Sequence, residues 1–219
     1  MKKTELVEYI DHTVLAPDNT IKEIKKACNE ALKYNFKGVC VHPCFVKNTA
    51  ELLATSRVKT ISVAGFPLGT NTTEIKLNEV KKALTDGAGE IDVVANIGAI
   101  KEKNWDYLKE EIASLIKITR EVSAILKVII ETGYLTEEEK KTIGNLCIDK
   151  GVDYLKTCTG FGPGQATVHD ISLLKKLGGE DINIKASGKI RSYNEAINLI
   201  SSGADRIGAS RSIDIIEGH

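Results

Sequence analysis

The chain has 219 residues, 42% of them hydrophobic, and Lys+Arg 30 balance Asp+Glu 30. This balance leaves no basic excess for nucleic acid phosphates or an anionic membrane, so we expect a small-molecule partner, no nucleic acid and no membrane. The N-terminal stretch lacks the apolar run of a signal peptide, no run is long enough to span a membrane, and the five cysteines are scattered. These features predict a cytoplasmic protein with reduced thiols.

Short runs of β-branched residues alternate with longer amphipathic segments, as expected for βα units around a parallel sheet. In chain order, the predicted strands cover residues 10–15, 36–41, 58–65, 89–96, 125–131, 152–157, 182–187 and 205–210. The predicted helices cover a short N-terminal segment and residues 20–34, 45–55, 72–86, 103–122, 136–150, 167–177 and 192–202. Thr136, three residues before Glu139, predicts a capping box at one helix start, and Gly87, Gly151 and Gly203 mark helix ends.

Eight such units predict an α/β fold, a TIM (β/α)8 barrel, in which residues 1–219 form a single domain with a short N-terminal helix. The first strand, IDHTVL, is the weakest of the eight. Without it, the remaining strands would also fit an open doubly wound sheet. We prefer the barrel because the first βα turn carries no GxGxxG motif for a nucleotide.

Charged residues lie near the carboxyl ends of three predicted strands, where a β/α barrel holds its active site. Alternation along the strands turns Asp92, Lys156 and Lys185 toward the barrel interior. One interpretation is a buried lysine–aspartate ion pair, with the second lysine extending to water. The other is catalysis: a second cation disfavours the charged form of a lysine, so Lys185 would free the Lys156 amine to attack a carbonyl, and Asp92 would move protons through a water.

Small polar loops follow the last two strands and run directly into helices. Small residues allow close backbone approach, and helix N-termini offer free N–H groups to an anion, which is the usual phosphate position in phosphate-binding barrels. Ordinary turn chemistry is the alternative, but two adjacent loops that carry Lys189 and Arg211 favour phosphate. The residues expected to bind substrate or phosphate are Thr157, Gly188, Lys189, Gly208, Ser210 and Arg211.

Other candidates are weaker. The segment CVHPC contains Cys40, His42 and Cys44, but it does not reproduce the spacing of zinc ligands, so we expect no metal and interpret Cys40 as a pocket-lining or core thiol. His12 would either orient a catalytic water or serve as a structural histidine, and the second outcome is the more common. His169 follows a predicted helix cap and is expected at the surface.

The segments IDHTVL, EIDVVANIGA, VIIETGYLTEEE, VDYLKTCTGFG and INIKASGKIR resemble the deoxyribose-phosphate aldolases over nearly the whole chain. The resemblance implies a class I aldolase that reversibly cleaves 2-deoxy-D-ribose 5-phosphate into acetaldehyde and D-glyceraldehyde 3-phosphate, with no metal or organic cofactor. It implies a homo-oligomer, a dimer or a tetramer. It also implies that Lys156 forms the Schiff base, Lys185 perturbs it and Asp92 relays protons. Supporting residues are expected at Asp11, Thr13 and Cys40.

Two departures from the family pattern keep other functions open. The family usually has a glycine pair where this chain has Gly188 and Lys189, and a second small residue where it has Arg211. A Schiff-base aldolase of the same fold acting on another sugar phosphate or an unphosphorylated aldehyde is one alternative. A non-catalytic barrel that binds sugar phosphates is another.

Overall fold

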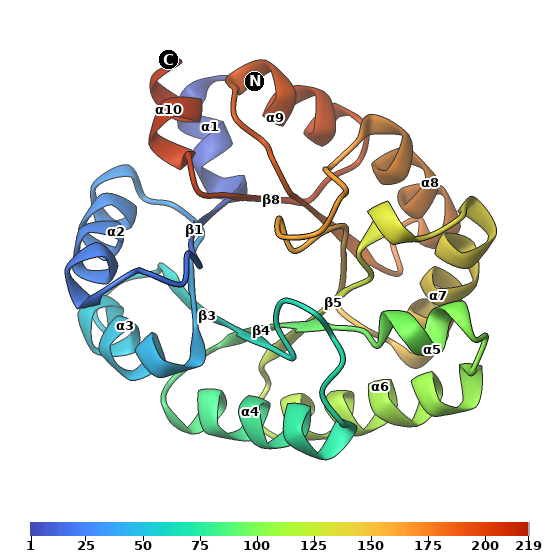
Figure 1. Ribbon diagram of the computed structural model, residues 1–219. Helices are drawn as coiled ribbons and strands as arrows, with labels where there is room; N and C mark the ends of the chain where they lie inside the picture. The colour runs from blue at the N-terminus through green and yellow to red at the C-terminus, as the bar shows by residue number, and fades with distance from the viewer. Residues whose placement is uncertain (219) are drawn as a thin grey trace.

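The computed structural model describes residues 1–218, which form a closed barrel of parallel strands in the order β1 to β8 (Figure 1). The strands are β1 (Ile10–Val14), β2 (Gly38–Val41), β3 (Lys59–Ala64), β4 (Glu90–Val94), β5 (Ile125–Ile129), β6 (Tyr154–Lys156), β7 (Asn183–Ser187) and β8 (Arg206–Ala209). Pairing of β1 with β8, with Asp11 opposite Gly208, closes the barrel. The TIM barrel prediction is confirmed, including its weakest strand.

Helices surround the strands in an outer ring (Figure 1). They are α1 (Lys3–Leu6), α2 (Ile21–Tyr34), α3 (Val46–Leu53), α4 (Thr73–Thr85), α5 (Ile97–Lys101), α6 (Trp105–Arg120), α7 (Glu137–Lys150), α8 (Val168–Gly178), α9 (Tyr193–Ser201) and α10 (Ser212–Glu217). Short 3-10 turns lie at Val7–Tyr9, Pro43–Phe45 and Thr132–Tyr134. The sequence reasoning missed α5, which is too short to show a helical period, whereas α10 is the helix expected directly after the loop that ends at Arg211.

The helix boundaries follow the predicted caps. The Thr136 hydroxyl accepts a hydrogen bond from the Glu139 N–H at 3.2 Å, and the Glu139 carboxylate accepts one from the Thr136 N–H at 2.8 Å. This reciprocal pair is the predicted capping box of α7. At the other end of α7, Gly151 adopts φ 76°, a left-handed conformation that glycine takes without steric cost.

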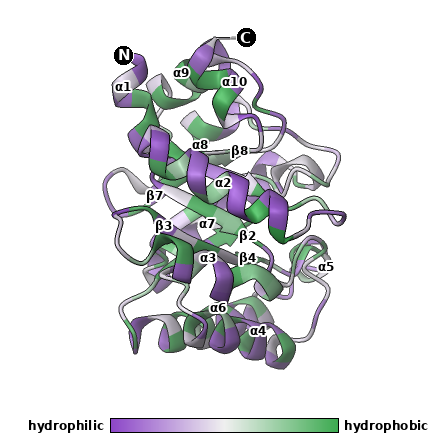
Figure 2. Ribbon diagram, turned by 90° about the vertical axis from the view of Figure 1, so that its left-hand side faces the viewer, coloured by the Kyte–Doolittle hydropathy of each residue, from purple (hydrophilic) through white to green (hydrophobic). Residues whose placement is uncertain are grey.

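The main hydrophobic core lies between the barrel and its helices. Residues of the strands that point outward, such as Ile91, Val93, Leu155 and Ile184, are at most 1% exposed and belong to this core. In the side view, the outer face of α2 is largely hydrophilic and the strands behind it are largely hydrophobic (Figure 2). The residues between them on each strand therefore point into the barrel, as the period of two requires.

The barrel interior is divided by chemistry. On the side of β2 and β3 it holds a small apolar cluster of Leu15, Cys40, Ile61 and Val63. Buried charged side chains from β1 and from β4 to β8 point into the rest of it. The five cysteines are free thiols, and no helix within residues 1–218 is long and apolar enough to cross a membrane.

Candidate active site

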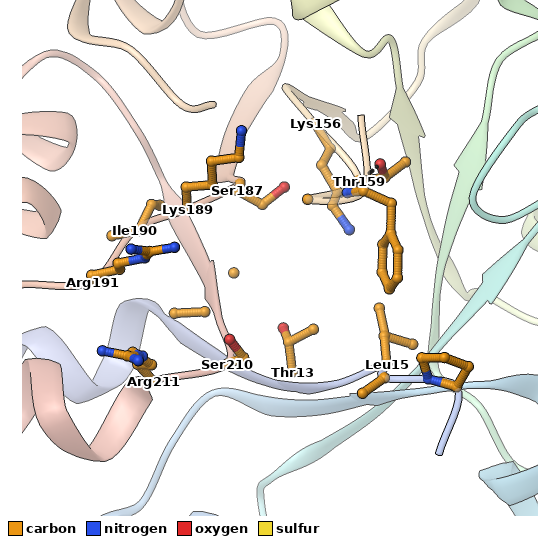
Figure 3. A pocket seen from close by; sticks show the side chains of 17 residues that line it. Thr13, Leu15, Lys156, Thr159, Ser187, Lys189, Ile190, Arg191, Ser210 and Arg211 are labelled. Atoms are coloured by element: carbon orange, nitrogen blue, oxygen red, sulfur yellow. Dashed lines mark hydrogen bonds between the residues drawn. The ribbon is translucent and has the colours of Figure 1, made fainter. Parts of the chain in front are cut away.

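A cavity of about 350 Å³ opens at the carboxyl ends of the strands, between the loops that follow β1, β6, β7 and β8 (Figure 3). Lys156 supplies its only buried amine among the lining residues of the described chain. The structure brings together the following predicted residues in its wall: Thr13, Lys156, Gly188, Lys189, Gly208, Ser210 and Arg211.

Lys156 is the last residue of β6 and is 2% exposed. The strand is held on both sides, because the Ile130 N–H donates to the Lys156 carbonyl at 3.0 Å and the Thr157 N–H donates to the Lys185 carbonyl at 3.1 Å. In Figure 3 the Lys156 amine points toward the open middle of the cavity. It donates a hydrogen bond to Asp92 Oδ2 at 2.8 Å. A lysine fixed in this way can meet a carbonyl carbon that enters from solvent.

The same oxygen, Asp92 Oδ2, accepts a second hydrogen bond from Lys185 Nζ at 2.8 Å. Both residues are fully buried. Burial acts to raise the pKa of Asp92, but the charges of Lys127, Lys156 and Lys185 outweigh it and hold the pKa well below the usual range. Asp92 is therefore a carboxylate at neutral pH.

Burial acts to lower the pKa of Lys185, but Asp11 and Asp92 outweigh it and raise the pKa. The Lys185 amine lies 2.5 Å from Asp11 Oδ2. Lys185 is therefore a permanent cation that shares a carboxylate oxygen with Lys156, as the catalytic interpretation requires.

Three more charges in contact with Asp92 or Asp11, or with each other, were missed by the sequence reasoning: Glu90, Lys127 and Arg206. Each is at most 1% exposed. The sequence contained a signal for two of them. Glu90 lies two residues before Asp92, and Arg206 lies two residues before Gly208. Alternation along a strand that points the later residue of each pair inward also points the earlier one inward.

The opposite side of the cavity carries positive charge. Lys189, Arg191 and Arg211 lie together there, across the cavity from Lys156 (Figure 3). Arg191 was not predicted, since it follows the expected loop and has no motif of its own. Lys189 adopts φ 59°, and its amine donates to the Pro163 carbonyl at 3.4 Å. A glycine at this position would adopt the left-handed backbone without the steric cost that a side chain adds.

The small residues of these loops are sterically required. A Cβ atom on Gly188 would lie 3.0 Å from Cys158 Cβ, and Gly188 adopts φ 106°. A Cβ atom on Gly208 would lie 3.0 Å from Lys185 Cε and from Ser187 Cβ. Gly208 therefore keeps the path of the Lys185 side chain open.

The cavity wall does not include the predicted residues Asp11, Asp92 and Lys185, which reach it through contacts with Lys156 or with one another, and it does not include Thr157 or Cys40. The hydroxyl of Thr157 is fully buried and donates to the Ser187 carbonyl at 2.9 Å, so it ties β6 to β7 and does not point at a ligand. Cys40 lies in the apolar cluster of the barrel interior, where burial raises the pKa of its thiol to about 11. Thr13 does line the cavity, and its hydroxyl donates to the Asp11 carbonyl at 3.0 Å.

His12 and His169 both lie away from the cavity. His12 Nε2 lies 3.0 Å from Glu30 Oε2 on α2, so its ring faces the helix layer and not the cavity. The side chain of His169 is 69% exposed, beside Glu137. The structural interpretation of His12 and the surface position of His169 agree with these contacts.

The sequence profile of the DeoC/LacD family of aldolases matches residues 6–188. A protein named deoxyribose-phosphate aldolase from Thermococcus kodakarensis is 48% identical over 220 residues, which cover 100% of this chain and 98% of the relative. A protein of the same name from Caldanaerobacter subterraneus is 47% identical over 222 residues, with coverages of 99% and 96%.

Solved structures agree with these relatives. A putative deoxyribose-phosphate aldolase from Coccidioides immitis superposes with a TM-score of 0.96 at 34% identity, covering 99% of this chain and 86% of that one. A deoxyribose phosphate aldolase from Aeropyrum pernix, described as a unique tetrameric structure, gives a TM-score of 0.92 at 29% identity, with coverages of 99% and 91%.

Proposed function

The chain belongs to the DeoC/LacD family of aldolases, and from this premise we propose that it reversibly cleaves 2-deoxy-D-ribose 5-phosphate into acetaldehyde and D-glyceraldehyde 3-phosphate. The observation that carries the proposal is the Lys156 amine, which opens into the cavity and is held 2.8 Å from a carboxylate that a second lysine shares. This is the arrangement that a Schiff-base lysine needs: a nucleophile, a proton carrier and a nearby cation.

The first step forms the Schiff base. The uncharged Lys156 amine attacks the aldehyde carbon of the open-chain sugar, and loss of water gives an iminium ion. A free lysine has a pKa of about 10.4, so such an amine is rare in water at neutral pH. Lys185 opposes protonation of Lys156 because both amines meet at Asp92 Oδ2.

The second step breaks the carbon–carbon bond. A base removes the proton from the C3 hydroxyl, the electron pair of the C2–C3 bond moves to the iminium nitrogen, and D-glyceraldehyde 3-phosphate leaves. Asp92 is the carboxylate nearest to Lys156, and we assign it the proton relay, through a water because it is fully buried. The remaining enamine takes a proton at C2, and hydrolysis then releases acetaldehyde and the lysine.

The phosphate group fits the positive side of the cavity. Gly188, Gly208 and Ser210 leave the backbone open to a ligand, and the side chains of Lys189, Arg191 and Arg211 surround them. Charge-assisted hydrogen bonds from arginine are the usual means of holding a phosphate. We propose that Arg191 joins the predicted phosphate-binding residues.

Borohydride trapping tests the proposal. Incubation with acetaldehyde and borohydride is expected to fix a reduced two-carbon adduct on the peptide that contains Lys156. A Lys156→Met variant should give no adduct and no turnover. A Lys76→Met variant is the matched control, since Lys76 is an equally buried lysine that pairs with Glu111 between α4 and α6. An unlabelled wild-type protein, or a Lys156→Met variant with full activity, would refute the assignment.

Comparing deoxyribose phosphate with free deoxyribose tests the phosphate site. We expect the kcat/KM for the phosphorylated sugar to be higher, and Arg191→Ala to reduce that preference by about tenfold, as loss of a charged hydrogen bond implies. Equal turnover of both sugars would favour an unphosphorylated aldehyde as the substrate. Stabilisation by the sugar phosphate without turnover would favour a non-catalytic binding barrel.

Assembly and location complete the proposal. Residues 1–219 are proposed to act as one catalytic domain within a homo-oligomer, which light scattering on the purified protein would test; the Aeropyrum pernix relative is described as a tetramer. The free thiols of all five cysteines support a reducing compartment such as the cytoplasm.

A further inference from the structure

The buried charges in the barrel form a closed ring of alternating sign. In the ring, each carboxylate contacts two cations and each cation contacts two carboxylates. Its six members in order are Asp92, Lys127, Glu90, Arg206, Asp11 and Lys185, and the last contacts the first.

The contacts of the ring are short throughout. Lys127 Nζ lies 2.5 Å from Glu90 Oε2 and 3.1 Å from Asp92 Oδ1. The Arg206 guanidinium donates to Asp11 Oδ1 at 2.6 Å and to Glu90 Oε1 at 3.1 Å. All six side chains are at most 2% exposed. Solvent therefore does little to screen the charge of any one of them from its neighbours.

The ring is electrically balanced without Lys156. It contains three cations and three carboxylates, and Lys156 attaches to it as a seventh group through Asp92 Oδ2. A protonated Lys156 would add a fourth cation to the three carboxylates of the ring. An uncharged Lys156 leaves the interior neutral, which is the cheaper state for buried groups.

Two further titratable groups of the described strands, Cys40 and Tyr154, face the interior, and the buried carboxylate of Glu131, just after β5, accepts a hydrogen bond from the Thr159 N–H at 2.9 Å. Cys40 on β2 stays a neutral thiol near neutral pH because burial raises its pKa to about 11. On β3 the inward residues are Ile61 and Val63. Tyr154 on β6 places its aromatic ring 5.8 Å from the Lys127 amine and 5.6 Å from the Arg206 guanidinium. The other strands contribute the ring members themselves.

We propose that Glu90, Lys127 and Arg206 are positioning residues that keep the Lys156 amine uncharged through the charge balance of the ring. None of the three lines the cavity, so they act at a distance from the substrate. The inference rests on the proposed function, since it concerns the lysine assigned to the Schiff base. It extends control of that lysine from Lys185 to the whole ring.

The pH dependence of kcat/KM separates this role from a structural one. Glu90→Gln leaves the ring with an excess positive charge, so protonation of Lys156 becomes harder and the acidic limb of the profile moves down by about one pH unit. Lys127→Met and Arg206→Met leave an excess negative charge and move the limb up by about one unit. These sizes are of the order that one poorly screened buried charge produces.

Two variants keep the balance and serve as references. In Glu90→Gln combined with Lys127→Met one charge of each sign is removed, so the acidic limb returns to its wild-type pH. Arg206→Lys retains the cation, and the limb stays in place whatever happens to kcat. Glu111→Gln breaks a buried ion pair outside the barrel interior and is expected to lower stability without moving the limb.

Melting curves are used to choose an assay temperature at which every variant that is compared is folded. Where no single variant folds, the balanced double variant becomes the reference, and adding Arg206→Met to it should move the limb up. Shifts of opposite sign that cancel in the double variant support the proposal. Limbs within about 0.3 pH unit of wild type in the unbalanced variants overturn it. Failure of the proposed function would appear differently, as loss of the borohydride adduct in the wild-type protein.

Discussion

Replacing Asp92 by asparagine tests the proton relay most directly. The substitution keeps the shape of the side chain but removes a carboxylate that contacts Lys127, Lys156 and Lys185. The amide oxygen can still accept a hydrogen bond, yet it cannot take a proton at neutral pH. The Lys156 amine meanwhile loses its nearest negative charge and is more readily uncharged.

Two magnitudes follow from these contacts. Loss of a positioned acid–base group lowers kcat by about 10²–10⁴-fold, which corresponds to roughly 3–5 kcal/mol of barrier. Breaking a buried ion pair costs about 3–5 kcal/mol of folding free energy. For a chain of this length that is a decrease of roughly 6–20 °C in melting temperature. Asp92→Asn should therefore still fold near room temperature.

The assay combines turnover, trapping and melting. Turnover of deoxyribose phosphate is followed through the released D-glyceraldehyde 3-phosphate, and the Schiff base is trapped with borohydride. We expect turnover to fall by at least about 10²-fold, while Lys156 still gains the adduct. Glu111→Gln is the matched control, because Lys76 Nζ lies 2.9 Å from both Glu111 oxygens in an equally buried pair.

The control decides what a loss of activity means. Glu111→Gln should lose similar stability and keep its turnover, since its ion pair lies between α4 and α6. Turnover of Asp92→Asn within tenfold of wild type would refute the relay. An equal loss of turnover in Glu111→Gln would show that weakened folding, and not proton transfer, explains the effect.

Three further predictions concern the loops and the ring. Lys189→Gly should raise the free energy of unfolding by about 0.5–1 kcal/mol in denaturant titrations, because glycine adopts the left-handed backbone at φ 59° without strain. Loss of the lysine charge should also raise KM for the phosphorylated sugar more than for free deoxyribose. An unchanged free energy of unfolding would contradict the backbone argument. Gly208→Ala should lower kcat by about tenfold, with the melting temperature little changed, because the new methyl group would lie 3.0 Å from Lys185 Cε and displace that side chain. A wild-type kcat would show that the Lys185 side chain accommodates the methyl group without loss of function. Asp11 and Asp92 have lowered pKa values because neighbouring cations outweigh the effect of burial, which alone would raise them. Their contribution to the free energy of unfolding is present above the pKa of about 3.9 of unfolded aspartates and is lost as the pH falls through the pKa values of the folded protein. Melting temperatures should therefore drop steeply below about pH 4. A flat profile there would contradict the ion pairs of the ring.

Much of the fold could be predicted from the order of apolar and polar residues. Each predicted strand and long helix is present, because strand and helix periods are local properties that every segment carries in its own residues. Cap residues are local signals too, and they predicted where helices begin and end, as at Thr136 and Gly151 of α7. Local patterns could not give α5, which is less than two turns long, and they gave only the start of α10, directly after the last loop.

The order of residues along the chain was enough to place part of the buried charge in the barrel interior and to identify the loops at the mouth of the cavity. Alternation placed Asp92, Lys156 and Lys185 inward, and small residues marked the anion side. The choice of partners was left to the tertiary structure. Barrel closure brings Asp11 and Arg206, which are 195 positions apart, to 2.6 Å, and so completes a balanced ring to which the Lys156 amine attaches through Asp92. Charge balance depends on distances between strands, which no single segment encodes.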